Sequence, residues 1–335
     1  MLRVIEDEAA IKKWHALFSR TIKSLRDEQI QVHIGHQGAS TRMKVSWSKH
    51  LGLWNVSTRA SENPYWNAFG LEKPVPSSHI PIVCEINFPI RGIDRRIGGA
   101  MAKDRFGRVF AVHRGKIGGG KKGIGKTLFE DLYRGAWTVM EDGDTETTVA
   151  LIGELQSPRF ARQVAQFVRK VDAIKNQASP AANQMALPFA HQLREGLIGQ
   201  GYGNCVQIES SACDHGLIVR DLDAELARYG LAGKNGEEHD LAALDRYGKR
   251  TALFSIMTDT SLNALYTETT KLLLSALKTK DQPRKFLVVP EETPAAGLNE
   301  LKKLAIDRLD YRWQKDHAVF PGLNLLIGAK ETGPA

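Results

Sequence analysis

The chain contains few cysteines and no long apolar run, and both absences limit what the protein can be. Cys84, Cys205 and Cys213 are its three cysteines among 335 residues, and no two of them form a CxxC pair. The sequence therefore argues against a structural zinc site and fits a reducing compartment. No segment reaches the roughly 18 apolar residues that a membrane helix needs. Acidic residues lie at the N-terminus where a signal peptide would be apolar, so we expect a cytoplasmic protein.

Acidic residues are also scarce in one part of the chain. The whole chain carries a formal net charge of +8. Residues 1–180 contain 28 Lys and Arg against 18 Asp and Glu, whereas residues 181–335 contain 18 against 20. Within residues 91–127 the ratio is 11 basic to 2 acidic. A local excess of this kind suits a polyphosphate partner, because each neutralised phosphate releases counterions. A solvated basic face that only aids solubility is the alternative.

We therefore predict double-stranded DNA, with either modified or unmodified bases, as the partner of the N-terminal half. The candidate DNA-binding residues are Arg95, Arg96, Arg105, Arg108, Arg114, Lys116, Lys121, Lys122 and Lys126.

The pattern of apolar residues predicts two domains. Residues 1–175 form a basic α+β domain, with helices expected over 5–28 and 157–175 and strands over 82–90, 107–117 and 147–155. Residues 176–186 are small and polar and are expected to form a linker. Residues 187–335 alternate between helical and strand patterns, which predicts a mixed sheet flanked by helices and an α/β fold class.

Residues 120–127, GKKGIGKT, match the phosphate-loop pattern GxxxxGK[ST]. In a nucleotide-binding protein, backbone amides would hold the phosphates while Lys126 and Thr127 contact the terminal phosphate and magnesium. The strand before a phosphate loop is almost wholly apolar, but here it contains His113, Arg114 and Lys116. We therefore favour contact with a DNA backbone, where glycines allow close approach and lysines neutralise charge. A flexible basic loop without a defined role is a further alternative.

Four aromatic residues near the basic region are candidates for stacking on unpaired or flipped bases: Trp47, Trp54, Tyr65 and Trp66. Their spacing is equally typical of a strand core, and we favour the core.

From about residue 187 to residue 320 the sequence resembles the PD-(D/E)XK nuclease superfamily, the fold of many restriction endonucleases. The resemblance rests on the order of elements and on Asp240 in EHDLAALDR, which matches the first acidic position of that family. The next strand, ALFSIMTDTS, has Ser255 and Met257 where the family has its second acid and its lysine. Serine supplies no carboxylate charge and methionine no cation, so these residues predict a degenerate site that serves as a scaffold, a dimerisation unit or a DNA clamp.

Some restriction enzymes that resemble this family place Ser at the acid position and take Glu from the following helix. By that resemblance Asp240, Glu268 and Lys271 would rebuild a one-metal site, with Glu195 from the first helix as a further catalytic candidate. Asp240 and Glu268 would then be the ligands of Mg²⁺. The alternative, which we favour from the sequence, is that Glu268 and Lys271 form a surface ion pair.

The sequence thus predicts a DNA-binding protein of the restriction or defence type, expected to be a homodimer, with a degenerate nuclease-like domain. The restriction or defence context is implied by the resemblance alone. An active Mg²⁺-dependent endonuclease with migrated catalytic residues, a nucleotide-binding protein and a non-enzymatic assembly subunit are the alternatives. No role is assigned to His215 or His239, because neither has the spacing of a metal ligand.

Overall fold

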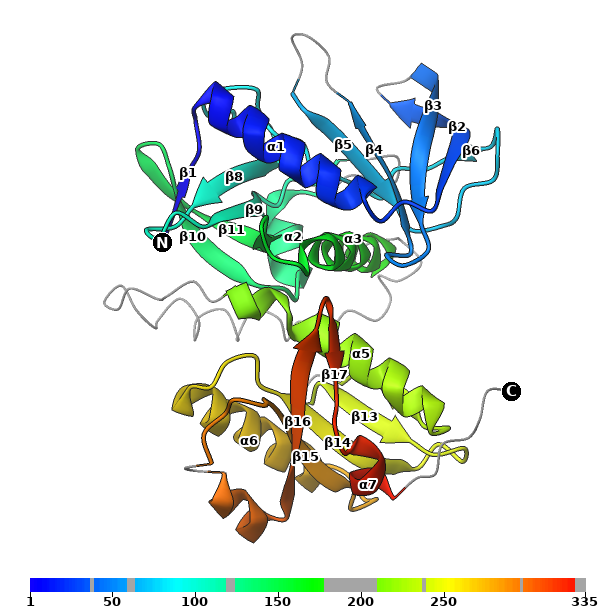
Figure 1. Ribbon diagram of the computed structural model, residues 1–335, viewed down its shortest axis with the longest axis vertical. Coiled ribbons are helices and arrows are strands. Elements are labelled where there is room, and N and C mark those ends of the chain that lie inside the picture. Colours follow the sequence, from blue (N-terminus) through cyan, green and yellow to red (C-terminus); the bar gives the residue numbers. More distant parts are fainter. Residues whose placement is uncertain are drawn as a thin grey trace. The chain divides into compact units, whose positions relative to one another are not determined.

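The computed structural model describes residues 1–36, 39–58, 64–118, 124–177, 210–236, 239–295 and 298–328. The chain divides into two compact units, Met1–Ser210 and Ser211–Ala335 (Figure 1). Both contain helices and sheets, which confirms the mixed α/β class. Most of the expected linker, and the helix and strand expected over 187–209, lie outside the described residues. In the described part of the chain, no helix has the length and apolar character needed to span a membrane.

One half of the first unit is a closed five-stranded barrel. Its strands, in order around the barrel, are β1 (Leu2–Val4), β10 (Trp137–Asp142), β11 (Thr145–Glu154), β9 (Val109–His113) and β8 (Gly99–Lys103). Only the β1–β10 pair is parallel. Every residue of β9 is buried, because the strand is covered on both faces.

The other half is a six-stranded sheet with the order β6 (His79–Ile80), β2 (Glu28–His36), β3 (Ala39–Ser48), β4 (Leu53–Thr58), β5 (Trp66–Gly70) and β7 (Cys84–Glu85). The strand expected over 82–90 is wrong in extent, since only Cys84 and Glu85 form β7. Pro81 and Pro89 flank this segment, and proline has no amide hydrogen to donate to a sheet.

Two amphipathic helices pack against these sheets. α1 (Glu8–Lys23) begins where the Asp7 carboxylate accepts a hydrogen bond of 2.7 Å from the Ala10 amide, and it buries Ile11, Phe18 and Ile22. α3 (Phe160–Gln177) buries its apolar stripe in the same core. α1 is shorter than the expected 5–28 because the chain turns into β2 at Glu28. A short helix, α2 (Lys126–Leu132), follows the glycine-rich segment.

The second unit is a six-stranded mixed sheet. Its strands, in spatial order, are β12 (Ala232–Lys234), β13 (Leu241–Leu244), β14 (Arg250–Ile256), β15 (Arg284–Pro290), β16 (Ile306–Gln314) and β17 (His317–Val319). β14, β15 and β16 are parallel, and the other neighbours are antiparallel. Between β15 and β16 the chain forms the 3₁₀ segment η2 (Asn299–Leu304). The remaining short elements are η1 (Ser210–Cys213) and α7 (Leu323–Ile327).

Helices cover both faces of this sheet. α5 (His215–Arg228) packs against one face, in a core that includes Phe254 and Ile256 of β14. α6 (Leu262–Leu277) packs against the other face, in a core that includes Leu253 and Met257. Because strand residues alternate between faces, Ser255 shares the face of Leu253 and Met257 and lies under α6.

Candidate functional site

In the second unit a carboxylate of α6 contacts Ser255 of β14, the residue that the sequence resemblance aligns with the second acid of the nuclease family. Ser255 in β14 is fully buried, with a relative exposure of 0%. Its Oγ donates a hydrogen bond of 2.7 Å to Oε2 of Glu268 in α6. Glu268 forms the ion pair with Lys271 that the sequence favoured, although its own side chain is only 13% exposed. Glu268 therefore places negative charge where Ser255 has none.

The cation beside this carboxylate comes from the helix as well. Lys271 lies one turn after Glu268, and its Nζ donates a hydrogen bond of 2.7 Å to Glu268 Oε1. Met257, at the position of the family's lysine, is buried in the core against α6. In the described residues of this unit, the half-exposed Lys271 is thus the cation bound to Glu268.

Asp240 lies just before β13 and is held by two donors. Its Oδ2 accepts a hydrogen bond of 2.6 Å from the backbone amide of Ile256, the residue after Ser255. Its Oδ1 lies 3.1 Å from Nε2 of His215, the first residue of α5. Burial by itself raises the pKa of Asp240, but the hydrogen bond and charge of His215, the Ile256 amide and the charge of Lys271 together outweigh it. The pKa of this carboxyl therefore lies below its ordinary value, and Asp240 stays ionised.

Asp240 and Glu268 are oxygen ligands of the kind that Mg²⁺ prefers, and Mg²⁺ is commonly bound through one or two carboxylates while it keeps several waters. Within the described residues of the second unit, His215, Asp240 and Glu268 do not have ligand atoms all within 4.8 Å of one another. These three residues therefore do not form a metal centre of three protein ligands. Glu195, the further catalytic candidate, lies outside the described residues.

Two histidines that the sequence left without a role lie at this cluster. His215 contacts Asp240, and His239 Nδ1 lies 2.8 Å from Oγ of Ser275, which is one turn beyond Lys271 on α6. Sequence spacing gave no signal for either contact, because both join residues from separate elements. His215 orients Asp240 from the opposite helix.

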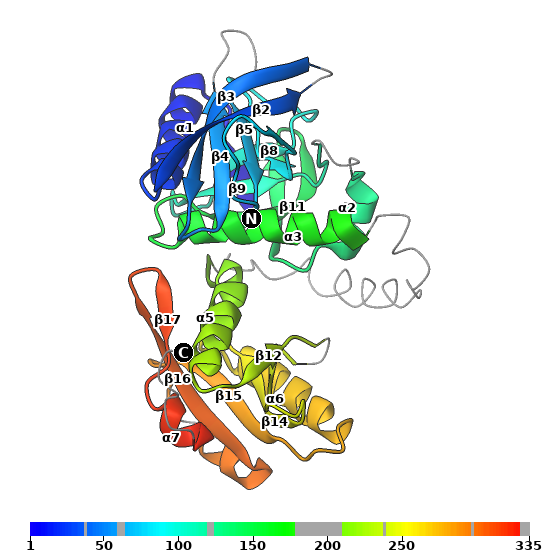
Figure 2. The ribbon, with the colours of Figure 1, turned by 90° about the vertical axis from the view of Figure 1, so that its right-hand side faces the viewer.

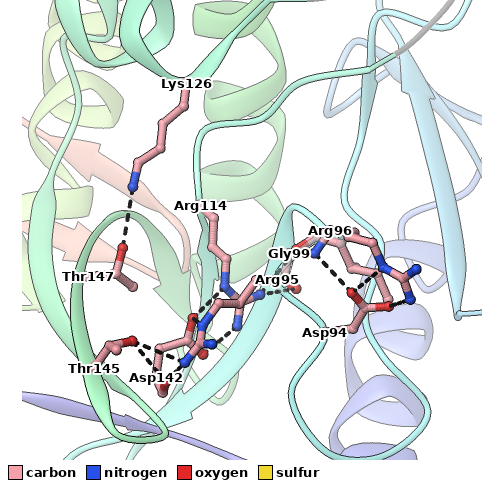
Figure 3. Close-up of polar contacts among 10 residues, drawn as sticks. Asp94, Arg95, Arg96, Gly99, Arg114, Lys126, Asp142, Thr145 and Thr147 are labelled. Carbon is pink, nitrogen blue, oxygen red and sulfur yellow. Dashed lines mark hydrogen bonds and ion pairs between the residues drawn. The ribbon is translucent and has the colours of Figure 1, made fainter.

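The basic segment of the first unit is more extensively neutralised than its composition predicted (Figure 3). The prediction that Arg114 binds DNA is wrong. Its side chain is 7% exposed and makes a bidentate pair with the buried carboxylate of Asp142, at 2.9 and 2.7 Å. Arg95 also donates to the backbone carbonyl of Asp142 at 2.6 Å and to Thr145 Oγ1 at 3.1 Å. Both arginines therefore fix the β10–β11 turn.

Other cations of this segment have acidic neighbours. Arg96 is bound to Asp94, and hydrogen bonds from the Arg96 side chain and amide hold the pKa of Asp94 below its ordinary range. Arg108 Nε lies 2.7 Å from Asp104, and Lys126 Nζ lies 3.8 Å from Glu130. Arg105 and Lys116 are exposed, and Arg105 lies over the Phe106 ring. Lys121 and Lys122 lie outside the described residues.

The surroundings of the glycine-rich segment differ from those of a phosphate loop. β9, the strand before it, pairs antiparallel with both of its neighbours, β8 and β11. A phosphate loop instead follows a strand of a parallel sheet. The geometry therefore gives no support to the nucleotide-binding alternative.

Two of the proposed stacking residues are core residues. Trp54 and Tyr65 are 1% and 3% exposed, so they cannot stack on a base, and their assignment as stacking residues is wrong. Trp47 and Trp66 are half-buried and pack against the core of the six-stranded sheet. All four aromatic side chains therefore contribute to packing, because a small domain needs large apolar side chains to fill its core.

Comparison of the chain with protein-family models, with curated proteins and with solved structures gives no match.

Proposed function

We propose that this protein is a DNA-binding protein of the restriction or defence type whose second unit is a Mg²⁺-dependent DNA endonuclease with a rearranged site. The observation that carries the proposal is the hydrogen bond from the buried Ser255 hydroxyl to Glu268. The restriction or defence context and the expected cytoplasmic location come from the sequence resemblance and composition. A homodimer is part of the proposal, since two symmetry-related sites would reach the two strands of a duplex.

The part-buried charges argue for a functional site. Removing a carboxylate and a lysine from water costs several kcal/mol per ion in general, and apolar side chains of similar size are often as stabilising. Met257, which is packed in the core beside α6, is an apolar side chain that already occupies one position on this strand face. Asp240, Glu268 and Lys271 nevertheless lie around one strand end, which favours selection for chemistry over selection for stability.

Each group would have a distinct role. Asp240 and Glu268 would hold the divalent ion, which when bound supplies charge stabilisation at the scissile phosphate and lowers the pKa of water. Lys271 would neutralise a phosphate oxygen, as the family's strand lysine does. Ser255 would orient Glu268, and His215 would orient Asp240 as the outer partner of a metal ligand.

The sequence-based prediction of a degenerate, silent domain is the competing proposal, and cleavage assays separate the two. Purified full-length protein would be incubated with modified and unmodified duplex DNA in Mg²⁺ or Mn²⁺. We expect cleavage by the wild type and a loss of about 100- to 1000-fold in Glu268→Gln and in Asp240→Asn, since removing a positioned charge costs about 2.7–4 kcal/mol of transition-state stabilisation.

Glu225→Gln is the matched control, because Glu225 forms an equivalent i,i+3 pair with Arg228 on α5. It should leave cleavage unchanged. Cleavage that survives Glu268→Gln but not Asp240→Asn would reject Glu268 as the replacement ligand. If the wild type cuts no substrate in either metal, the endonuclease proposal fails and the second unit is a binding or assembly module.

A further inference from the structure

The β2–β3 hairpin forms a two-stranded ribbon that extends beyond the rest of its sheet. Glu28–His36 pair with Ala39–Trp47 along their whole length. In the described residues β4 pairs only with the Ser46–Ser48 end of β3, and β6 pairs only with His33 and Ile34 of β2. On the other edge, the Ser77 amide donates to the Gln31 carbonyl and the His33 amide donates to the Ser78 carbonyl, so residues 77–80 line the outer edge of β2. In the described residues the outer part of β3, from Ala39 to Val45, pairs with β2 alone (Figure 2).

This ribbon has one apolar and one basic face. Ile30, Val32 and Ile34 on β2 and Val45 on β3 are buried in a local core. The cross-strand pairs Gln31–Lys44 and His33–Arg42 lie on the opposite face. Arg42 and Lys44 are exposed. No Asp or Glu occurs between residues 29 and 61. The ribbon's one acid, Glu28 at the inner end of β2, is paired with Lys73 at 2.5 Å.

The polar face is also partly preorganised. Arg42 Nη2 donates a hydrogen bond of 3.1 Å to Gln31 Oε1, its diagonal neighbour across the two strands. The rings of His33 and His79 lie 5.0 Å apart, which continues the face onto β6. Among the described residues neither Arg42 nor Lys44 has an ion-pair partner, in contrast to Arg95, Arg96, Arg108 and Arg114.

We propose that the β2–β3 ribbon enters the major groove of double-stranded DNA, with Arg42 and Lys44 contacting phosphates or guanine edges and Gln31 contacting a base edge. The major groove of B-form DNA is wide enough for a two-stranded ribbon, and ribbon proteins use it in this way. Arg and Lys pair with guanine, and Gln pairs with adenine. The inference rests on the proposed function for the identity of the partner, but it assigns a different surface from the basic segment 91–127.

The experiment measures binding of the full-length protein to duplex DNA, without divalent metal, over a series of salt concentrations. Arg42→Ala/Lys44→Ala should weaken binding on the order of tenfold or more and reduce the salt slope by about 1.8, since each phosphate contact contributes about 0.9. Lys12→Ala/Arg20→Ala removes the same charge from the exposed face of α1 and should change the slope far less. Gln31→Ala should alter base preference at one position with an unchanged slope.

Methylation of guanine N7, which lies in the major groove, provides a second readout. It should interfere with wild-type binding at a few positions, and these positions should lose their effect in the Arg42→Ala/Lys44→Ala variant. Equal losses in that variant and in the α1 control, or preferred binding of single strands or RNA, would overturn the inference. Binding that depends on the ribbon in a protein that never cuts DNA would uphold the inference and reject only the endonuclease proposal.

Discussion

Exchanging the residues at positions 255 and 268 tests whether Glu268 supplies the charge that the strand lacks. The cycle consists of Ser255→Glu, Glu268→Ser and the double variant, which has the carboxylate back on β14 and the hydroxyl on α6. The two side chains touch in the wild type, at 2.7 Å. The double variant therefore keeps the same two side chains at the site and moves the carboxylate from α6 to the neighbouring position on β14.

The expected effects on stability follow from burial. Glu268→Ser leaves the fully buried Ser255 hydroxyl without its acceptor, which should lower the free energy of unfolding by about 1–3 kcal/mol. Ser255→Glu buries a second carboxylate against Glu268, which should lower it by about 3–5 kcal/mol, as for an uncompensated buried charge. The double variant has one carboxylate again, so it should be more stable than the sum of the single effects by about 1–3 kcal/mol.

Urea denaturation with and without Mg²⁺ measures both stability and metal binding. A ligand that binds only the folded state stabilises it by about 2.7 kcal/mol at 100 times its Kd. We expect Mg²⁺ to stabilise the wild type and the double variant but not Glu268→Ser. Stabilisation of Glu268→Ser equal to that of the wild type would refute the role of Glu268. A wild-type response that the double variant lacks would contradict the expectation that a carboxylate on β14 can replace the one on α6.

Two further predictions concern the barrel of the first unit. Asp142→Ala should lower the free energy of unfolding by about 3–5 kcal/mol, because it leaves the guanidinium of Arg114 buried and unpaired; an equal loss in the exposed neighbour variant Asp144→Ala, measured in urea, would contradict this account. Burial lowers the pKa of His113 from 6.5 to about 4, assisted by the charge of Arg114. The unfolded chain therefore binds this proton at a higher pH than the folded chain, and stability should fall between pH 6.5 and pH 4 by up to about 3 kcal/mol. His113→Gln should show a shallower dependence of unfolding free energy on pH in this range, and a slope equal to that of the wild type would exclude His113 as its source.

The periodicity of the sequence determined most elements that position the second site. The strands that the sequence analysis recognised in EHDLAALDR and ALFSIMTDTS contain β13 and β14, the helix after them is α6, and the helix expected over 5–28 contains α1. These patterns are readable because burial of a strand or helix face requires side chains at fixed local intervals. The spacing from Ser255 to Glu268 was informative for the same reason, since a helix that follows a strand packs back on its sheet.

Charge composition, in contrast, did not determine which cations are available to a ligand. Residues 91–127 contain a large basic excess. Asp142 lies outside that range, but it forms a buried ion pair with Arg114 within the barrel. That contact depends on β9, β10 and β11 being neighbours in a particular register. A count along the chain cannot include it, because the two residues are far apart in sequence.

The contacts around Asp240 were decided by tertiary structure alone. His215 reaches Asp240 from the first residue of α5, and the Ile256 amide reaches it from the next strand. The hairpin face with Gln31, Arg42 and Lys44 became identifiable only once the register showed which side chains share its exposed side. Local patterns fix which face of each element is buried, whereas the packing of elements fixes which polar side chains meet.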